Sequence, residues 1–258
     1  MREHIDIVAE NLGKTFSNGT KHLIAIENVA IEVGRGKLFC IVGPSGCGKS
    51  TLLRLLIGLL EPTTGKVILD LDRRNKGIAY VQQTASLLPW RTVLQNALLG
   101  AELKGPLNST IVERIKNGIR EYGLAGFEQS MPPELSGGMR QKVDIIRAIE
   151  SRPKILFCDE PFSAIDFVTR LELSTRFKKM CRVHGITTVF VTHNIEEAIF
   201  LGDEIVVMSG RPGRIISKYI PALSIGSEDA VKCRESPEFS DLFFKIWKDL
   251  GNENSLSH

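Results

Sequence analysis

The segment KLFCIVGPSGCGKSTLLRLL, residues 37–56, joins an apolar run of β-forming residues to a leucine-rich helix through a glycine-rich turn. The turn has the spacing G-x-x-x-x-G-K-S, and a strand before it and a helix after it are the context that a phosphate-binding loop requires. Its G-x-x-G-x-G pattern differs from the G-x-G-x-x-G of dinucleotide-binding sites. We therefore predict that this segment binds the phosphates of a nucleotide; a chance match to the pattern is the alternative.

The residue types in this loop fit phosphate chemistry. Gly43, Gly46 and Gly48 can adopt positive φ and carry no Cβ, so successive backbone N–H groups can turn toward phosphate oxygens. Lys49 would bring a positive charge to the outer phosphates, and the hydroxyl of Ser50 would ligate Mg²⁺. The predicted nucleotide-binding residues of the loop are Gly43, Pro44, Ser45, Gly46, Cys47, Gly48, Lys49, Ser50 and Thr51.

Length and composition restrict the class of protein. A chain of 258 residues can hold one large α/β domain with an inserted or appended subdomain. A net charge of +3 is too small to indicate a nucleic-acid partner, and we expect none. Residues 1–20 have no secretory pattern, and the apolar segment 52–60 is too short to span a membrane. The five cysteines have no metal-binding spacing and are typical of a reducing cytosol.

The order of hydrophobic patterns predicts the organisation of the chain. Residues 4–33 alternate like strands around an Asn-Gly hairpin turn, and the strand 66–71 leads through a charged turn, 72–77, into the strand 78–82. Helical periodicity begins near Thr92, with a capping box at Thr110 and Glu113. We predict an α/β domain at 1–222 that contains a helical subdomain at about 87–150, followed by a linker and an amphipathic helix at 223–258.

The α/β pattern returns after the helical section. We expect strands at 154–159, 187–192 and 204–208 and helices at 167–184 and 195–201. The first of these strands ends in Asp159 and Glu160. Such an acidic pair often only caps the next helix. Downstream of a phosphate-binding loop, however, Asp159 would hold Mg²⁺ and Glu160 would polarise an attacking water as a general base.

The segment Leu135-Ser136-Gly137-Gly138-Met139-Arg140-Gln141 resembles the signature sequence of the ATP-binding subunits of ABC transporters. Its two glycines leave the N-terminus of the following helix bare, and Ser136 adds a hydroxyl, so the three residues can receive a γ-phosphate. The resemblance implies an α/β fold with a P-loop NTPase (RecA-like) core, an N-terminal antiparallel β subdomain and an inserted α-helical subdomain. It also implies an ATPase in which Ser136, Gly137 and Gly138 act on the ATP of a second subunit.

Further residues match the family's motifs one by one. Gln83 matches the glutamine that reaches Mg²⁺ and the attacking water, and His193 matches the switch histidine at the γ-phosphate. Phe16 stands where an aromatic ring stacks on adenine, and the segment 163–166 matches the loop that couples the two sites. Alone, His193 and Phe16 would be read as core residues. The resemblance implies the catalytic residues Glu160, His193, Gln83 and Lys49 and the Mg²⁺ ligands Ser50, Gln83 and Asp159.

The resemblance also implies partners. An ATP-sandwich homodimer would bind at the cytoplasmic face of the inner membrane to a separate permease, which an extracytoplasmic solute-binding protein supplies. Residues 87–96 and 208–215 resemble the subunits of nitrate, sulfonate and taurine importers. A non-transport ABC ATPase of translation or DNA repair would need two cassettes or a long coiled coil, and a small-molecule kinase would lack the signature.

Cys47 lies inside the phosphate-binding loop, at the expected N-terminus of a helix. Because that position favours the thiolate, we expect the pKa of Cys47 to be lowered. Alkylation of Cys47 would then block ATP binding and be prevented by ATP.

Overall fold

The computed structural model describes residues 4–19, 21–71, 77–225 and 228–255. Its centre is a six-stranded sheet with the order β5-β6-β7-β3-β8-β9, in which only β9 is antiparallel to its neighbour. Every residue of β3, β6 and β7 is buried, as expected for a parallel sheet covered on both faces. The strands are β3 (Leu38–Val42), β5 (Ile78–Val81), β6 (Ile155–Asp159), β7 (Thr187–Thr192), β8 (Glu204–Met208) and β9 (Ile215–Tyr219).

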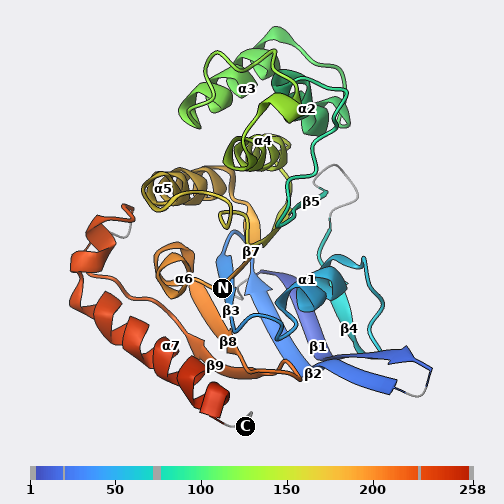
Figure 1. Cartoon of the computed structure of the whole chain (residues 1–258), viewed down its shortest axis with the longest axis vertical. Coiled ribbons are helices and arrows are strands. Elements are labelled where there is room, and N and C mark those ends of the chain that lie inside the picture. Colours follow the sequence, from blue (N-terminus) through green and yellow to red (C-terminus); the bar gives the residue numbers. More distant parts are fainter. Residues whose placement is uncertain (1–3, 20, 72–76, 226–227, 256–258) are drawn as a thin grey trace.

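A second, antiparallel sheet has the order β2-β1-β4 and consists of β1 (Ile5–Asn18), β2 (Lys21–Gly34) and β4 (Thr64–Leu69). Helix α1 (Lys49–Ile57) packs between the two sheets (Figure 1). Its buried residues Leu52 and Leu56 share one apolar cluster with Ile7 of β1 and Phe39 of β3. The start of α1, where the phosphate-binding loop ends, is therefore held by both sheets.

The other helices are α2 (Val93–Glu102), α3 (Ser109–Glu121), α4 (Gly137–Glu150), α5 (Phe167–His184), α6 (Ile195–Leu201) and α7 (Pro237–Ser255), with the 3₁₀ turns η1 (Pro132–Glu134) and η2 (Lys232–Glu235). In Figure 1, α2, α3 and α4 lie at the top, while α5, α6 and α7 lie along the left side of the large sheet. Phe162, Phe177 and Phe190 join the sheet to the helices, with ring centroids 5.6 or 5.7 Å apart. No helix among the described residues is long and apolar enough to cross a bilayer.

The predicted α/β fold is confirmed, and the bounds of α5, α6, β7 and β8 coincide with those expected. The capping box predicted at Thr110 and Glu113 is wrong. The N-cap of α3 is Asn108, whose side-chain oxygen accepts from the Ile111 amide at 2.9 Å, because Asn is a strong cap that comes earlier in the chain. The charged turn expected at 72–77 falls mostly outside the described residues.

Candidate active site

The phosphate-binding loop connects the carboxyl end of β3 to α1. Gly46 and Gly48 have φ of 76° and 106°, whereas Gly43 does not use the positive φ that a glycine can adopt. Gly43 is needed for space, since a Cβ there would lie 2.9 Å from Cys47 Sγ and 3.1 Å from Met208 Cβ. A residue with a side chain at position 43 would therefore clash with Cys47 and with Met208 of β8, which explains why this residue is a glycine.

Lys49 is buried at the first position of α1, and its ammonium group faces back into the loop. Its Nζ donates to the carbonyl oxygens of Gly43 and Pro44, both at 2.9 Å, and lies 3.9 Å from Glu160 Oε1. The charge is thus held in place between the loop and the carboxylate. It is positioned to meet phosphate oxygens that enter the loop.

Ser50 and Asp159 bring two oxygen donors together at the base of the site. Ser50 Oγ donates to Asp159 Oδ1 at 3.0 Å, and Asp159 is the last residue of β6. Burial raises the pKa of Asp159, and the hydrogen bond from Ser50 offsets part of that rise. Two protein oxygens completed by phosphates and waters suit Mg²⁺. Within the described part of the chain, no group of three His, Cys, Asp or Glu could hold a metal alone, so the nucleotide would have to complete this site.

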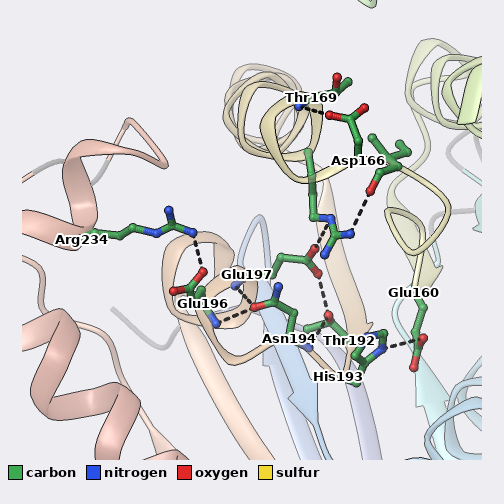
Figure 2. Close-up of polar contacts among 11 residues, drawn as sticks. Glu160, Asp166, Thr169, Thr192, His193, Asn194, Glu196, Glu197 and Arg234 are labelled. Atoms are coloured by element: carbon green, nitrogen blue, oxygen red, sulfur yellow. Dashed lines mark hydrogen bonds and ion pairs between the residues drawn. The ribbon is translucent and has the colours of Figure 1, made fainter.

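The Glu160 side chain contacts residues of three other segments of the chain, Lys49, Gln83 and His193. Its Oε2 lies 2.9 Å from Nδ1 of His193 (Figure 2). The same oxygen accepts from Nε2 of Gln83 at 3.4 Å. The Glu160 backbone has φ of 47°, a conformation that is costly for a residue with a side chain, and its amide donates to the Val191 carbonyl at 2.9 Å. The backbone strain and the three side-chain contacts together fix the carboxylate at the mouth of the loop.

A pocket over the loop collects most of the predicted site residues. Phe16 is 41% exposed and stands opposite Leu23 in the β1–β2 ladder, so the two side chains form an apolar end suited to a base. The polar end contains Lys49 and Glu160. The pocket is lined by Phe16, Leu23, Ala25, Ser45, Gly46, Gly48, Lys49, Ser50, Thr51, Gln83, Glu160 and Arg211.

Arg211 is a site residue that sequence reasoning missed. The motif around it, 208–215, indicated only a subfamily, but its loop docks on the pocket: Arg211 Nη2 donates to the Gly46 carbonyl at 2.9 Å. Gly213 anchors that loop to β2 through the backbone of Ala25 and Glu27, at 2.9 and 3.0 Å. Arg211 therefore adds a second positive charge beside the phosphate-binding loop.

Replacing Arg211 with methionine should weaken ATP binding by about 3- to 10-fold, the effect of losing one charged hydrogen bond at a partly exposed site. Turnover at saturating ATP should change less, because Glu160 is untouched. The measurement is the Kd for a fluorescent ATP analogue. Arg214→Met, which removes an exposed ion pair with Glu27 from the same loop, is the control. Equal affinity in the wild type and Arg211→Met would contradict the assignment.

The expectation for Cys47 is wrong. Its side chain is 1% exposed and packs into the core between the sheets, and burial raises the pKa of the thiol more than the charge of Lys49 lowers it. The loop turns this side chain into the core and not into the pocket, which an argument from the helix terminus does not take into account.

All five cysteines are buried. We therefore expect an alkylating reagent at neutral pH to leave the native chain unmodified, with or without ATP, and to label it only in denaturant. Mass spectrometry after a timed reaction checks this. Rapid, ATP-sensitive labelling of Cys47 in the native chain would contradict the buried placement.

The signature residues lie apart from the pocket. Ser136 is the N-cap of α4, where its Oγ accepts from the Met139 amide at 3.2 Å, and Ser136 and Gly137 are exposed. Among the described residues, those that line the pocket include none of Ser136, Gly137 and Gly138. Asp166, in the predicted coupling loop, is the N-cap of α5 and accepts from the Thr169 amide at 3.0 Å. The signature residues and the predicted coupling loop therefore belong to segments that do not line the pocket.

A phosphate-binding loop after β3 and an acidic pair at the end of β6, with β7 between them, define a P-loop nucleotide hydrolase of the α/β class. The chain belongs to the ABC transporter family, whose conserved region matches residues 26–163, and it is an ATPase of that family.

Known relatives extend over nearly the whole chain. An ABC transporter ATP-binding protein of Methanocaldococcus jannaschii is 42% identical over 98% of this chain and 94% of its own length. A taurine import ATP-binding protein of Burkholderia pseudomallei is 34% identical over 96% of this chain and 97% of its own length. An aliphatic sulfonates import ATP-binding protein of Bacillus cereus is 38% identical over 80% of this chain and 82% of its own length. A nitrate import ATP-binding protein of Synechococcus elongatus is 35% identical over 93% of this chain and 88% of its own length.

A solved structure has the same fold. The dimeric post-hydrolysis state of an ATP-binding cassette, bound to ADP and phosphate, superposes with a TM-score of 0.74 at 31% identity. The match covers 84% of this chain and 99% of that one.

Proposed function

We propose that this chain is the ATP-hydrolysing subunit of an importer for a small solute of the taurine, sulfonate or nitrate kind, and that it binds a separate membrane permease from the cytoplasmic side. The observation that carries the proposal is the end-to-end similarity to import ATP-binding proteins, which includes the C-terminal segment outside the conserved region. We propose the division into an ATPase domain at 1–222 and a C-terminal unit at 223–258 on the same basis.

The proposed chemistry follows from the contacts around Glu160. Lys49, Ser50 and Thr51 bind the phosphates, while Phe16 stacks on adenine. Ser50, Asp159 and Gln83 would hold Mg²⁺, which neutralises charge on the β- and γ-phosphates when it is bound. Glu160 accepts the proton of the attacking water, and His193, 2.9 Å from it, holds the carboxylate in position and contacts the γ-phosphate.

The position of the signature supports a dimer. Ser136 and Gly137 at the start of α4 are exposed and do not line the pocket of their own chain, so a second copy can present its pocket to them. ATP would then lie between the pocket of one protomer and the signature of its partner. Hydrolysis would remove that link and open the dimer.

A groove beside the pocket supports the contact with a permease. It is formed by Tyr80 of β5, Leu99 of α2, Leu103 just after α2 and Arg147 of α4, and Leu103 is 81% exposed. Gln141 of α4 donates to the Gln82 carbonyl at 3.0 Å, next to Gln83. A helix of the permease seated in this groove would therefore respond to movement of Gln83.

Uptake by the host tests the proposal. A strain that lacks this chain should lose uptake of at least one of radiolabelled taurine, an alkyl sulfonate or nitrate, and the wild-type gene but not Glu160→Gln should restore it. Unchanged uptake of all three solutes, with an active purified ATPase, would reject this group of cargoes. A second experiment tests the partner. The chain should be recovered in the membrane fraction when its permease is co-expressed and not in the absence of the permease.

A further inference from the structure

Arg234 joins the C-terminal segment to the helices behind the active site. It lies in η2, where its guanidinium forms an ion pair with Glu196 of α6 (Figure 2). Its Cζ also lies 5.0 Å from the ring centroid of Phe167, the first residue of α5. One side chain thus contacts the first turns of two helices.

Both helices begin directly after loops that the active site uses. Helix α5 follows the predicted coupling loop and is capped by Asp166, while α6 follows His193 and is capped by Asn194. The Asn194 Oδ1 atom accepts from the amides of Glu196 and Glu197 at 2.9 and 3.2 Å. A residue that fixes the first turn of α6 therefore also fixes the direction in which the His193 segment enters it.

A partly buried chain of polar contacts connects the same two loops. Arg170 Nη2 donates to the Ile165 carbonyl at 2.8 Å, and its Nε lies 3.6 Å from Glu197 Oε1. Glu197 Oε2 accepts from Thr192 Oγ1 at 2.6 Å, and Thr192 precedes His193. Movement of either loop must therefore be accommodated by the other.

The C-terminal segment is held firmly against this network. The amide of Ala230 donates to Thr175 Oγ1 at 3.2 Å, and Phe239 is buried. Ala230, Arg234 and Phe239 close a small pocket whose floor is made by α5 and α6. None of the three lies in the region 26–163 that matches the family.

We propose that Arg234 is a positioning residue. Through its contacts with Phe167 and Glu196 it sets the orientation of the coupling loop relative to the His193 turn. The C-terminal segment thereby controls the rate of ATP turnover. The inference rests on the roles proposed for His193 and the coupling loop. ATP binding depends on residues of the pocket that Arg234 does not touch. Loss of the Arg234 contacts with Phe167 and Glu196 should therefore lower kcat and leave the affinity for ATP nearly unchanged.

Four variants of the full chain test this proposal by kcat, Kd for ATP and Tm. Arg234→Met should lower kcat by about 3- to 10-fold, the effect of one partly exposed ion pair together with one cation–π contact, with Kd within about twofold of wild type. Glu196→Arg should behave similarly, and the exchange of both charges, Arg234→Glu with Glu196→Arg, should recover part of kcat. Arg182→Met, which cuts an ion pair between α5 and Glu228 of the same segment together with a 3.5 Å contact to Asp203, should keep the wild-type kcat.

An unchanged kcat in Arg234→Met would overturn the proposal, and so would an equal loss in Arg182→Met, which would mean that the segment only stabilises the fold. A loss of kcat that the charge exchange does not relieve would also count against it. An inactive wild-type chain would instead contradict the ATPase function, so the two failures can be told apart.

Discussion

Replacing Glu160 with glutamine should lower the rate of ATP hydrolysis by about 10²- to 10⁴-fold, the usual contribution of a general base. Glutamine keeps the shape of the side chain and can still hydrogen-bond to Gln83 and His193, but it cannot take a proton at neutral pH. Since Lys49 and the loop amides remain, ATP should still bind. The measurement is phosphate release by the purified chain at saturating MgATP.

The same variant should accumulate as a dimer, because nucleotide that is not hydrolysed keeps the pocket and the partner's signature together. Light scattering after gel filtration in MgATP should show a dimer for Glu160→Gln and mostly monomer for the wild type. Glu172→Gln, the same change at an exposed position of α5, is the matched control. Phosphate release at the wild-type rate would remove Glu160 from its proposed role.

The phosphate-binding loop and the acidic pair could be predicted because each is a local pattern. In both, an apolar strand is followed within a few residues by the chemically active group, so the order of residues already places Lys49 after β3 and Asp159 at the end of β6. The parallel sheet then brings the two together. Its register pairs Asp159 with Val191, two positions before His193, which explains why Glu160 and His193 meet.

Features that depend on docking between distant segments could not be predicted. Arg211 reaches Gly46 across 165 positions, and its loop is placed by backbone hydrogen bonds to β2 that no periodicity reveals. The inward direction of Cys47 depends on the space beside Gly43, where an added Cβ would lie 2.9 Å from Cys47 Sγ. Trp247 falls on the apolar spacing of α7 and yet is 59% exposed, because only one side of that helix meets the body of the domain.

Replacing Lys49 with methionine should weaken ATP binding by about 10²-fold or more and abolish measurable hydrolysis, since the variant loses a positioned charge where the transferred phosphate develops negative charge. The change also leaves the Gly43 and Pro44 carbonyls without their donor, which should lower the free energy of unfolding by about 1–3 kcal/mol. Lys49→Arg should restore little, because the planar guanidinium cannot occupy a buried site shaped for a compact ammonium.

Affinity and folding must be measured on the same samples, because an unfolded chain would also fail to bind. Kd for a fluorescent ATP analogue gives the first, and circular dichroism with thermal unfolding gives the second. Lys179→Met, at an exposed position of α5, should match the wild type in both. If folded Lys49→Met bound ATP within about threefold of the wild type, well below the loss expected for a missing phosphate contact, the loop of residues 43–48 would not be the phosphate site. That result would also contradict the proposed dimer, in which the loop of one protomer and the signature of its partner bind the same ATP.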